Sequence, residues 1–423
     1  MRFFFLLLPY SASNCVNICQ IFCYYRCLRN NYLLARSLIF SIMEIYYFKE
    51  GFMTHNPFLA GGTLGTNASI NKLIIAKMPL CTVTQPLTGK SAQDIFSTDL
   101  FIREIKNSAG KLQIDVSALE EKSLPLYLES SLESSNPYVR AAAHDILRLF
   151  GERLAVILLC LKEGSPENRK ARPDWTDEEW NYWNSLKHII LVGGLASPPL
   201  GEQLKFYVEQ VFKTSGKKPY TIILGRDSTY AGLRGCTTYL RPIPENPSNT
   251  VSEKDSLVNL IFDYGQSFIK RSYAIMEGQN VRDIVILGKT LSQHVDWDIK
   301  DPALEEQEAH ALNRFFLETI DRTVREVEAR GLSIHSHIIL SIANYVKDGK
   351  IANRGGYGKL RLIAPNYADY LSSYLKEHFG RNFYFTMLHD GTAMAAGYAD
   401  YKDSVCISLG TAFGVGFPEN RKI

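Results

Sequence analysis

Apolar residues recur every three or four positions in several long segments, and short apolar runs lie between these segments. The first pattern predicts amphipathic helices and the second predicts buried strands. Before residue 241 we expect three helices, at Ser91–Ala109, Asn136–Leu161 and Pro199–Phe212, and two strands, at His188–Val192 and Tyr220–Leu224. A polar stretch over residues 163–184 carries three tryptophans. The order of strand, Gly-rich turn, helix and strand is typical of an α/β nucleotide-binding domain.

A segment rich in Pro, Asn and Ser, Arg241–Ser252, separates this region from the next. Beyond it we expect a hairpin of strands Val258–Asp263 and Ser267–Met276, and then, in chain order, a strand at Ile284–Leu287, a helix at Pro302–Arg330, a strand at His337–Ala343, a helix at Pro365–Phe379, a strand at Phe383–Leu388, a helix at Gly391–Tyr401 and a strand at Val405–Leu409. No internal repeat is visible in the sequence. The pattern predicts two α/β domains, residues 53–240 and 255–423, joined by a linker at 241–254.

Residues 1–52 differ in composition from the rest of the chain. They are rich in Phe, Tyr, Leu, Asn and Cys, and they lack the Gly and Pro punctuation of a packed domain. The opening apolar run is short for a signal peptide and Pro9 interrupts it, while the run at residues 32–48 carries Arg36 and Glu44 and is a poor membrane span. We interpret this extension as spurious upstream translation with the true start near Met53; an interfacial anchor is the alternative.

Charge and cysteine content exclude several classes of protein. Lys and Arg number 47 against 44 Asp and Glu, so no basic field favours nucleic acid, and a small neutral or anionic ligand fits better. Four of the eight cysteines are spaced by four residues near the N-terminus, at Cys15, Cys19, Cys23 and Cys27. This spacing matches neither the paired CxxC of zinc sites nor a disulfide framework. The other four lie singly in apolar surroundings, as reduced cytoplasmic cysteines do.

Two Gly-rich turns each follow a buried strand. The first carries Asp263, Gly265, Gln266, Ser267 and Lys270, and the second carries Gly410, Thr411 and Gly414. Glycine permits close approach and positive φ, so such turns aim backbone N–H groups at phosphate oxygens. A carboxylate at a strand end, such as Asp263, can hold hydrated Mg²⁺. An ordinary structural hairpin is the alternative for each turn, but two such turns predict a phosphate clamp.

Asp390 lies where a buried strand ends and a helix of small residues begins. A carboxylate there can accept the proton of a substrate hydroxyl during phosphoryl transfer. The alternative role is a helix N-cap. A third Gly-rich turn, Gly193–Gly194, leaves room for the flat face of an adenosine, although a tight strand-to-helix turn has the same sequence.

Together these segments resemble the actin-like ATPase/hexokinase superfamily, and most closely the ROK family of sugar kinases and sugar-responsive repressors, over residues 85–423. The resemblance implies a two-domain α/β fold of the actin-like, ribonuclease H-like type with a central cleft. Asp263, Gly265 and Ser267 are similar to the first phosphate motif, Gly410–Gly414 to the second, Gly193–Gly194 to the adenosine motif, and His389–Asp390 to the Asn-Asp pair that holds the catalytic base. Asn344 and Asn353 are similar to substrate-contacting positions, with Asn353 the loosest match.

Three departures from the family pattern bear on function. The adenosine half precedes the phosphate half, which circular permutation explains, as would a truncation at Ile423 or an erroneous gene boundary. The family's Cys/His zinc site is not recognisable, so glucose-type specificity does not carry over. His389 replaces Asn and Gln266 replaces Gly, which predicts a changed substrate rim.

The resemblance implies a cytoplasmic ATP- and Mg²⁺-dependent kinase that phosphorylates a hydroxyl of a sugar-like molecule, with Asp390 as base and His389 near the substrate. We expect no nucleic-acid or membrane partner, and a homodimer is one assembly open to it. Two alternatives remain open. One is a non-catalytic, sugar-sensing relative, although no helix-turn-helix is visible. The other is an ATPase or filament subunit without a sugar acceptor.

Overall fold

The computed structural model describes residues 55–240, 257–278 and 280–418. Residues 57–423 form one compact unit. The predicted N-terminal extension and the predicted linker at 241–254 lie outside the described residues. No helix within the described ranges is both long and apolar enough to span a bilayer.

One sheet is built from the residues after 256. Strands β5 (Leu257–Tyr264), β6 (Phe268–Glu277) and β7 (Asn280–Leu291) form an antiparallel meander, which β9 (His337–Ile342) and β12 (Tyr384–His389) extend in parallel. The order is β12-β9-β5-β6-β7, with the short β8 (Ser333–Ile334) also paired to β5. β7 is much longer than the predicted strand at 284–287. The apolar run at 284–287 is only its middle, and the residues on either side are mostly polar or glycine, so they carry no strand signal in the sequence.

A second sheet combines segments from both ends of the chain. Its order is β14 (Gly414–Gly416), β13 (Ser404–Ser408), β3 (His188–Val192) and β4 (Thr221–Leu224). β13 runs parallel to β3, with Ser408 opposite Val192, and β14 is antiparallel to β13. The predicted domain boundary therefore needs correction, because residues 404–416 share a sheet with β3 and β4 and not with β5. A buried parallel strand does not reveal its partner locally, since every such strand is an apolar run.

The two sheets repeat one arrangement. In the first sheet the hairpin β5–β6 lies beside two parallel strands, β9 and then β12. In the second sheet the hairpin β13–β14 lies beside β3 and then β4 in the same way. In the first sheet the strands come in this order along the chain; in the second the parallel strands precede the hairpin. Phe58, near the start of the described chain, stacks on Phe417, which follows β14, with ring centroids 5.2 Å apart. The two sheets therefore share one spatial strand order but differ in the order of those strands along the chain.

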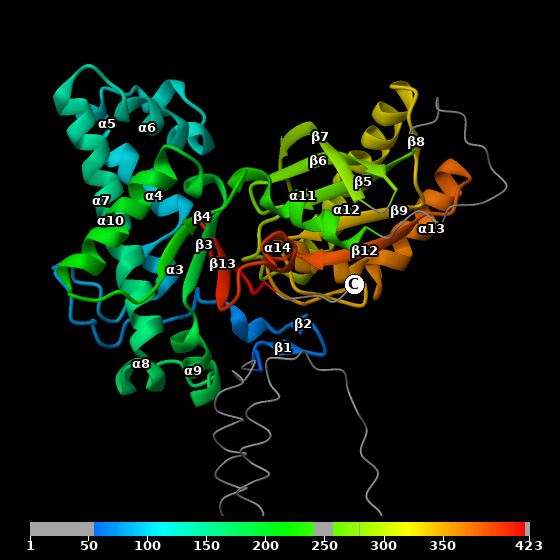
Figure 1. The fold of residues 1–423 in the computed structure, drawn as a ribbon. Helices are drawn as coiled ribbons and strands as arrows, with labels where there is room; N and C mark the ends of the chain where they lie inside the picture. The colour runs from blue at the N-terminus through cyan, green and yellow to red at the C-terminus, as the bar shows by residue number, and fades with distance from the viewer. Residues whose placement is uncertain (1–54, 241–256, 279, 419–423) are drawn as a thin grey trace, which may run out of the picture. The chain divides into compact units, whose positions relative to one another are not determined.

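Helices cover both sheets in layers (Figure 1). Alternate residues of β5 face opposite sides: Leu260 and Phe262 pack in one core with α12 (Pro302–Ala329) and α13 (Tyr367–Phe379), while Ile261 packs with α11 (Ala231–Cys236) and α14 (Asp390–Ala396). The second sheet uses α7 (Pro137–Glu163) and α10 (Leu200–Thr214) on its outer face. Its inner face, with Ile190 and Cys406, packs on α11 and α14. The two short helices are thus a shared central layer.

Glycines allow this central layer to pack closely. A Cβ on Gly235 of α11 would lie 1.5 Å from the carbonyl oxygen of Ala393 in α14, and one on Gly416 would lie 1.8 Å from that of Gly391. Neither position has room for a side chain. The small residues of these segments, which the sequence shows plainly, are therefore needed where the two halves meet.

The remaining elements of the described chain are six α-helices and two short hairpins. The helices are α3 (Ala92–Ile95), α4 (Thr98–Asn107), α5 (Ala109–Leu112), α6 (Leu124–Leu132), α8 (Pro166–Lys170) and α9 (Asp177–Ser185), and the hairpins are β1 (Leu59–Ala60) with β2 (Thr63–Leu64) and β10 (Val346–Lys347) with β11 (Lys350–Ile351). The predicted helix at 91–109 is split, because Phe96 and Ser97 are extended and Ser97 caps α4. The polar stretch at 163–184 contains α8 and α9, and its tryptophans are buried.

Candidate active site

The turn between β5 and β6 begins at Asp263, whose carboxylate is held on both oxygens. Lys270 Nζ lies 2.8 Å from Oδ2, and Ser341 Oγ donates a hydrogen bond of 2.7 Å to Oδ1. Lys270 is the cross-strand partner of Asp263 on β6, and Ser341 is its partner on β9. Each neighbouring strand therefore supplies one contact, and strand register fixes the position of the carboxylate.

The two Gly-rich turns meet. Ser267 Oγ, from the first sheet, lies 3.0 Å from Thr411 Oγ1, from the second. Each turn has its own support: Ser292 Oγ and the Tyr357 hydroxyl both donate to the carbonyl of Gly265, and Asn71 bonds both the N–H and the carbonyl of Phe413. Two hydroxyls and two glycine turns therefore converge on one place, as a ligand with several phosphate oxygens would require.

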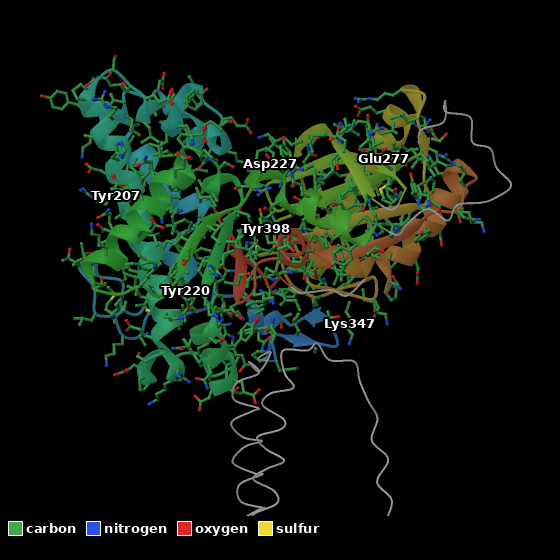
Figure 2. All side chains as sticks on the ribbon, viewed as in Figure 1. Tyr207, Tyr220, Asp227, Glu277, Lys347 and Tyr398 are labelled. Carbon is green, nitrogen blue, oxygen red and sulfur yellow. The ribbon has the colours of Figure 1, made fainter. Side chains whose placement is uncertain are left out.

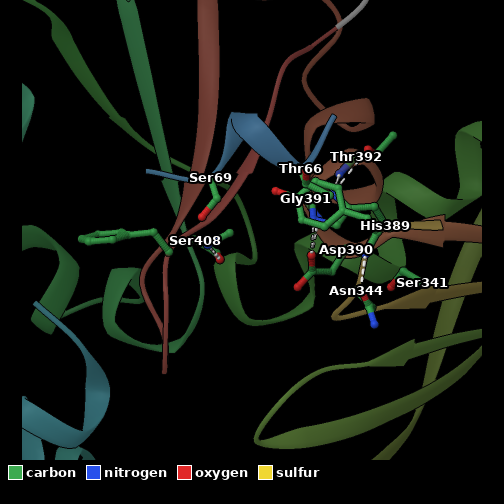
Figure 3. Close-up of polar contacts among 12 residues, drawn as sticks. Thr66, Ser69, Ser341, Asn344, His389, Asp390, Gly391, Thr392 and Ser408 are labelled. Carbon is green, nitrogen blue, oxygen red and sulfur yellow. Dashed lines mark hydrogen bonds and ion pairs between the residues drawn. The ribbon is translucent and has the colours of Figure 1, made fainter. Parts of the chain in front are cut away.

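Asp390 follows the last residue of β12 and begins α14 (Figure 3). Burial raises the pKa of Asp390 to about 7, and the negative charge of Asp263 adds to this effect, while the N–H of Gly391 and the charge of Lys270 oppose it. About a quarter of the side-chain surface is still accessible. A carboxylate with a pKa near neutrality can both accept and release a proton at physiological pH, as general base catalysis requires.

His389 lies against Asp390. Its Nδ1 accepts the N–H of Thr392 at 3.3 Å and so caps α14, which places the proton of the neutral ring on Nε2. Nε2 is 3.1 Å from Asp390 Oδ1. Burial, followed by the charge of Arg354, lowers the pKa of His389 to about 3, so the ring is neutral at physiological pH. A neutral imidazole N–H can donate a hydrogen bond that orients the carboxylate without forming an ion pair with it.

The predicted adenosine turn lies next to the second phosphate turn. Gly193 has φ of +94°, and a Cβ there would lie 2.7 Å from the carbonyl oxygen of Leu409. A side chain is excluded on both grounds. Gly194, one residue later, has no heavy atom within 4 Å of its Cβ position. Gly193 is therefore explained by packing, while the space beside Gly194 is open to a ligand.

Two predicted contact residues, Gln266 and Asn344, have other bonds in this structure. The Gln266 side chain donates to the carbonyl of Val295. Asn344 is 4% exposed, and its amide donates to the carbonyls of Ala352 and Arg354 while its oxygen accepts the N–H of Tyr345. These bonds position backbone, so a role in ligand binding stays a prediction for both. Asn353 is exposed in the loop that Asn344 holds.

Several residues near the site carry no local signal in the sequence. Ser341, Ser408 and Asn71 hold the two turns, and Tyr345 stacks on His389 with ring centroids 4.4 Å apart. Figure 3 shows Thr66, from the start of the described chain, close to Gly391 and His389. Asn71 is 342 residues from Phe413, so sequence spacing could not reveal the contact.

Neither of two surface hollows coincides with these residues. One, of about 530 Å³, is lined by residues of α3 and α4, including Asp94 and Arg103, and the other, of about 590 Å³, lies around Lys77 and Cys81. The central cleft therefore stays a prediction. Within the described ranges, no cluster of three or more His, Cys, Asp or Glu is arranged to hold a metal.

Comparison with known proteins adds little. No family model matches the sequence, and a search of curated proteins found no relative. A crystal structure of an exopolyphosphatase-like protein is similar over 64% of this chain and 87% of that one, at 10% identity and a TM-score of 0.24. A likeness this weak carries no argument about function.

Proposed function

We propose that this protein is an ATP-dependent kinase that phosphorylates a hydroxyl group of a sugar or sugar-like molecule. The observation that carries the proposal is the 3.0 Å contact between Ser267 and Thr411, which joins two Gly-rich turns from two sheets beside a buried carboxylate of raised pKa. The duplicated sheets around a shared layer of two helices support a permuted member of the actin-like ATPase/sugar-kinase superfamily. A cytoplasmic protein, alone or as a homodimer, is compatible with this proposal.

In the proposed reaction the two turns hold the nucleotide phosphates with backbone N–H groups, Ser267 and Thr411. Asp390 accepts the proton of the acceptor hydroxyl as that oxygen attacks the terminal phosphorus, and ADP leaves with the electrons of the broken P–O bond. His389 orients the Asp390 carboxylate. Because the base must be ionised, kcat/KM should rise as pH increases through about 7, the pKa of Asp390.

Mg²⁺ fits the donor chemistry present. Mg²⁺ commonly binds one or two carboxylates together with waters and phosphate oxygens, so a cage made of protein alone is not required. Asp263 would hold the ion, with Lys270, now 2.8 Å from its carboxylate, moving toward a phosphate. The ion would neutralise charge on the transferred phosphoryl group.

The test is ADP release by the full chain with ATP and Mg²⁺, over hexoses, amino sugars, polyols, sugar acids and sugar phosphates. We expect at least one acceptor to raise ADP release well above the rate without acceptor, with a phosphorylated product detected by mass spectrometry. ADP release that no acceptor stimulates would favour an ATPase instead. Sugar binding without any nucleotide turnover would favour a sensor.

A further inference from the structure

Arg354 is a cation without a carboxylate partner, and its charge acts on His389, the neighbour of the proposed base. Among the residues that the structure describes, it forms no ion pair; its guanidinium lies 5.0 Å from the centre of the Tyr345 ring, and Nη1 makes one long contact of 3.5 Å with the carbonyl of Thr66. Its side chain is exposed. By contrast, Arg172, Arg169 and Arg361 are each paired with an acid. An unpaired arginine at a candidate active site is available to a ligand.

The hairpin β10–β11 brings Arg354 and Tyr345 together. The N–H of Ala352 donates to the carbonyl of Tyr345 at 2.9 Å, which closes the base of the hairpin. Asn344 then holds the carbonyl of Arg354 at 2.7 Å. The buried amide therefore fixes the backbone from which Arg354 projects, while the guanidinium keeps only its contacts with the Tyr345 ring and the Thr66 carbonyl.

A second guanidinium lies on the same side. Arg172 is 2% exposed, its Nη2 donates to the carbonyls of Asn67 and Ser69, and its buried Nη1 has no hydrogen-bond partner. Tyr345 lies within the electrostatic range of Arg354, Asp390 and Arg172. The Tyr345 hydroxyl thus stands among two cations and the proposed base.

The negative charge of Asp390 and Asp263 would repel an anionic substrate unless a cation offset it. Lys270 is already engaged by Asp263. Of the two amides predicted to contact a neutral sugar, Asn344 has its hydrogen bonds taken by backbone groups, which leaves the exposed Asn353. A planar guanidinium matches the oxygens of phosphate or carboxylate in a two-pronged geometry.

We propose that the acceptor carries an oxyanion, a phosphate or carboxylate group, and that Arg354 binds this group with the Tyr345 hydroxyl while Asp390 activates a hydroxyl elsewhere on the same molecule. The substrate class is therefore a sugar phosphate or a sugar acid. This inference rests on the proposed kinase function. Arg172 adds positive potential from beneath.

The experiment compares matched acceptors in the ADP-release assay: hexoses, the corresponding hexose monophosphates, and aldonic or uronic acids. The wild type should use one anionic class with a kcat/KM at least tenfold above the neutral hexose, and which class does so distinguishes phosphate from carboxylate. Arg354→Gln should raise the KM for that acceptor about 10- to 100-fold, as loss of a charge-assisted hydrogen bond predicts, with little change in kcat. Arg354→Lys should recover part of the loss.

Arg282→Gln, an exposed arginine on β7, is the matched control and should behave as wild type. Equal use of neutral and anionic acceptors, or an unchanged KM in Arg354→Gln, would overturn the proposal. Calorimetry on Asp390→Asn separates the two hypotheses, because the acceptor anion should still bind, and adding Arg354→Gln should weaken that binding about 10- to 100-fold. Arg354-dependent binding without turnover in the wild type would refute the kinase and leave the anion site standing, whereas no binding at all would remove the site.

Discussion

The two sheets share one plan but differ at the ends of their strands. In the first sheet the hairpin begins with Asp263 and the last parallel strand leads into Asp390; in the second, Ser408 stands at the hairpin and Gly225 follows β4. Asp227, near the second position, is exposed and paired with Arg234 (Figure 2). At these two corresponding positions the first sheet therefore has carboxylates, whereas the second has a serine and a glycine. An asymmetric pair of lobes suits a reaction in which one side does chemistry and the other holds a nucleotide.

Replacing the two aspartates tests this asymmetry most strongly. Asp390→Asn should reduce kcat about 10²- to 10⁴-fold, because the positioned base is lost, while nucleotide affinity stays nearly unchanged. Asp227→Asn, at the corresponding turn of the other sheet, should leave kcat within about twofold, since its partner is a surface arginine. Steady-state kinetics and nucleotide titration measure both. Retained turnover in Asp390→Asn would remove Asp390 from the mechanism.

The second prediction tests the close packing of α11 on α14, the helix layer that the two sheets share. Gly235→Ala should lower the free energy of unfolding by about 3 kcal/mol, because its methyl group would overlap the carbonyl of Ala393 and force α11 from α14. Gly110→Ala is the control: nothing lies within 4 Å of its Cβ position, so a small gain of about 0.5 kcal/mol is expected. Urea unfolding reports both. Equal stability of the two variants would contradict the close packing.

Burial of Asp390 should appear in the pH dependence of stability. Its pKa is raised from 3.8 to about 7 in the folded protein, so ionisation opposes folding: the penalty is absent below about pH 4, grows between pH 4 and 7, and is constant above. Asp390→Asn should therefore be more stable than wild type at pH 8 by about 2 kcal/mol, since solvent at the accessible quarter of the side chain offsets part of the full shift. The measurement is the melting temperature of both proteins from pH 4 to pH 8. A difference between wild type and Asp390→Asn that does not change with pH would refute this.

The smallest effects concern the supports of the two turns. Asn71→Ala removes both hydrogen bonds to Phe413 and should weaken nucleotide binding about tenfold. Ser292→Ala removes one of two donors to Gly265, and the Tyr357 hydroxyl remains, so a change of about twofold is expected. Nucleotide titration compares them. A larger loss of affinity in Ser292→Ala than in Asn71→Ala would mean that the first turn depends more strongly on its side-chain hydrogen bonds than the second.

The positions of the candidate residues at strand ends and turns were largely predictable, while their functional roles stay predictions. Asp263 and Asp390 each stand at the end of a buried strand, and Gly193, Gly265 and Gly410 each mark a sharp turn, which are signals contained within a few neighbouring residues. Most strands and long helices were also predicted, because apolar periodicity reflects local burial. The split of the helix at 91–109, the full length of β7 and the helices α8 and α9 were not, since their patterns are polar or interrupted.

Local pattern thus specified the elements and the chemical groups at their ends. Folding decided which strands pair: β13 joins β3 across more than 200 residues, and this pairing places Thr411 in the second sheet, where it contacts Ser267 of the first. It also set the pKa of Asp390 and left Arg354 unpaired. The physical reason is that apolar strands are interchangeable in sequence, whereas face-to-face packing and the removal of water act only once distant segments are in contact.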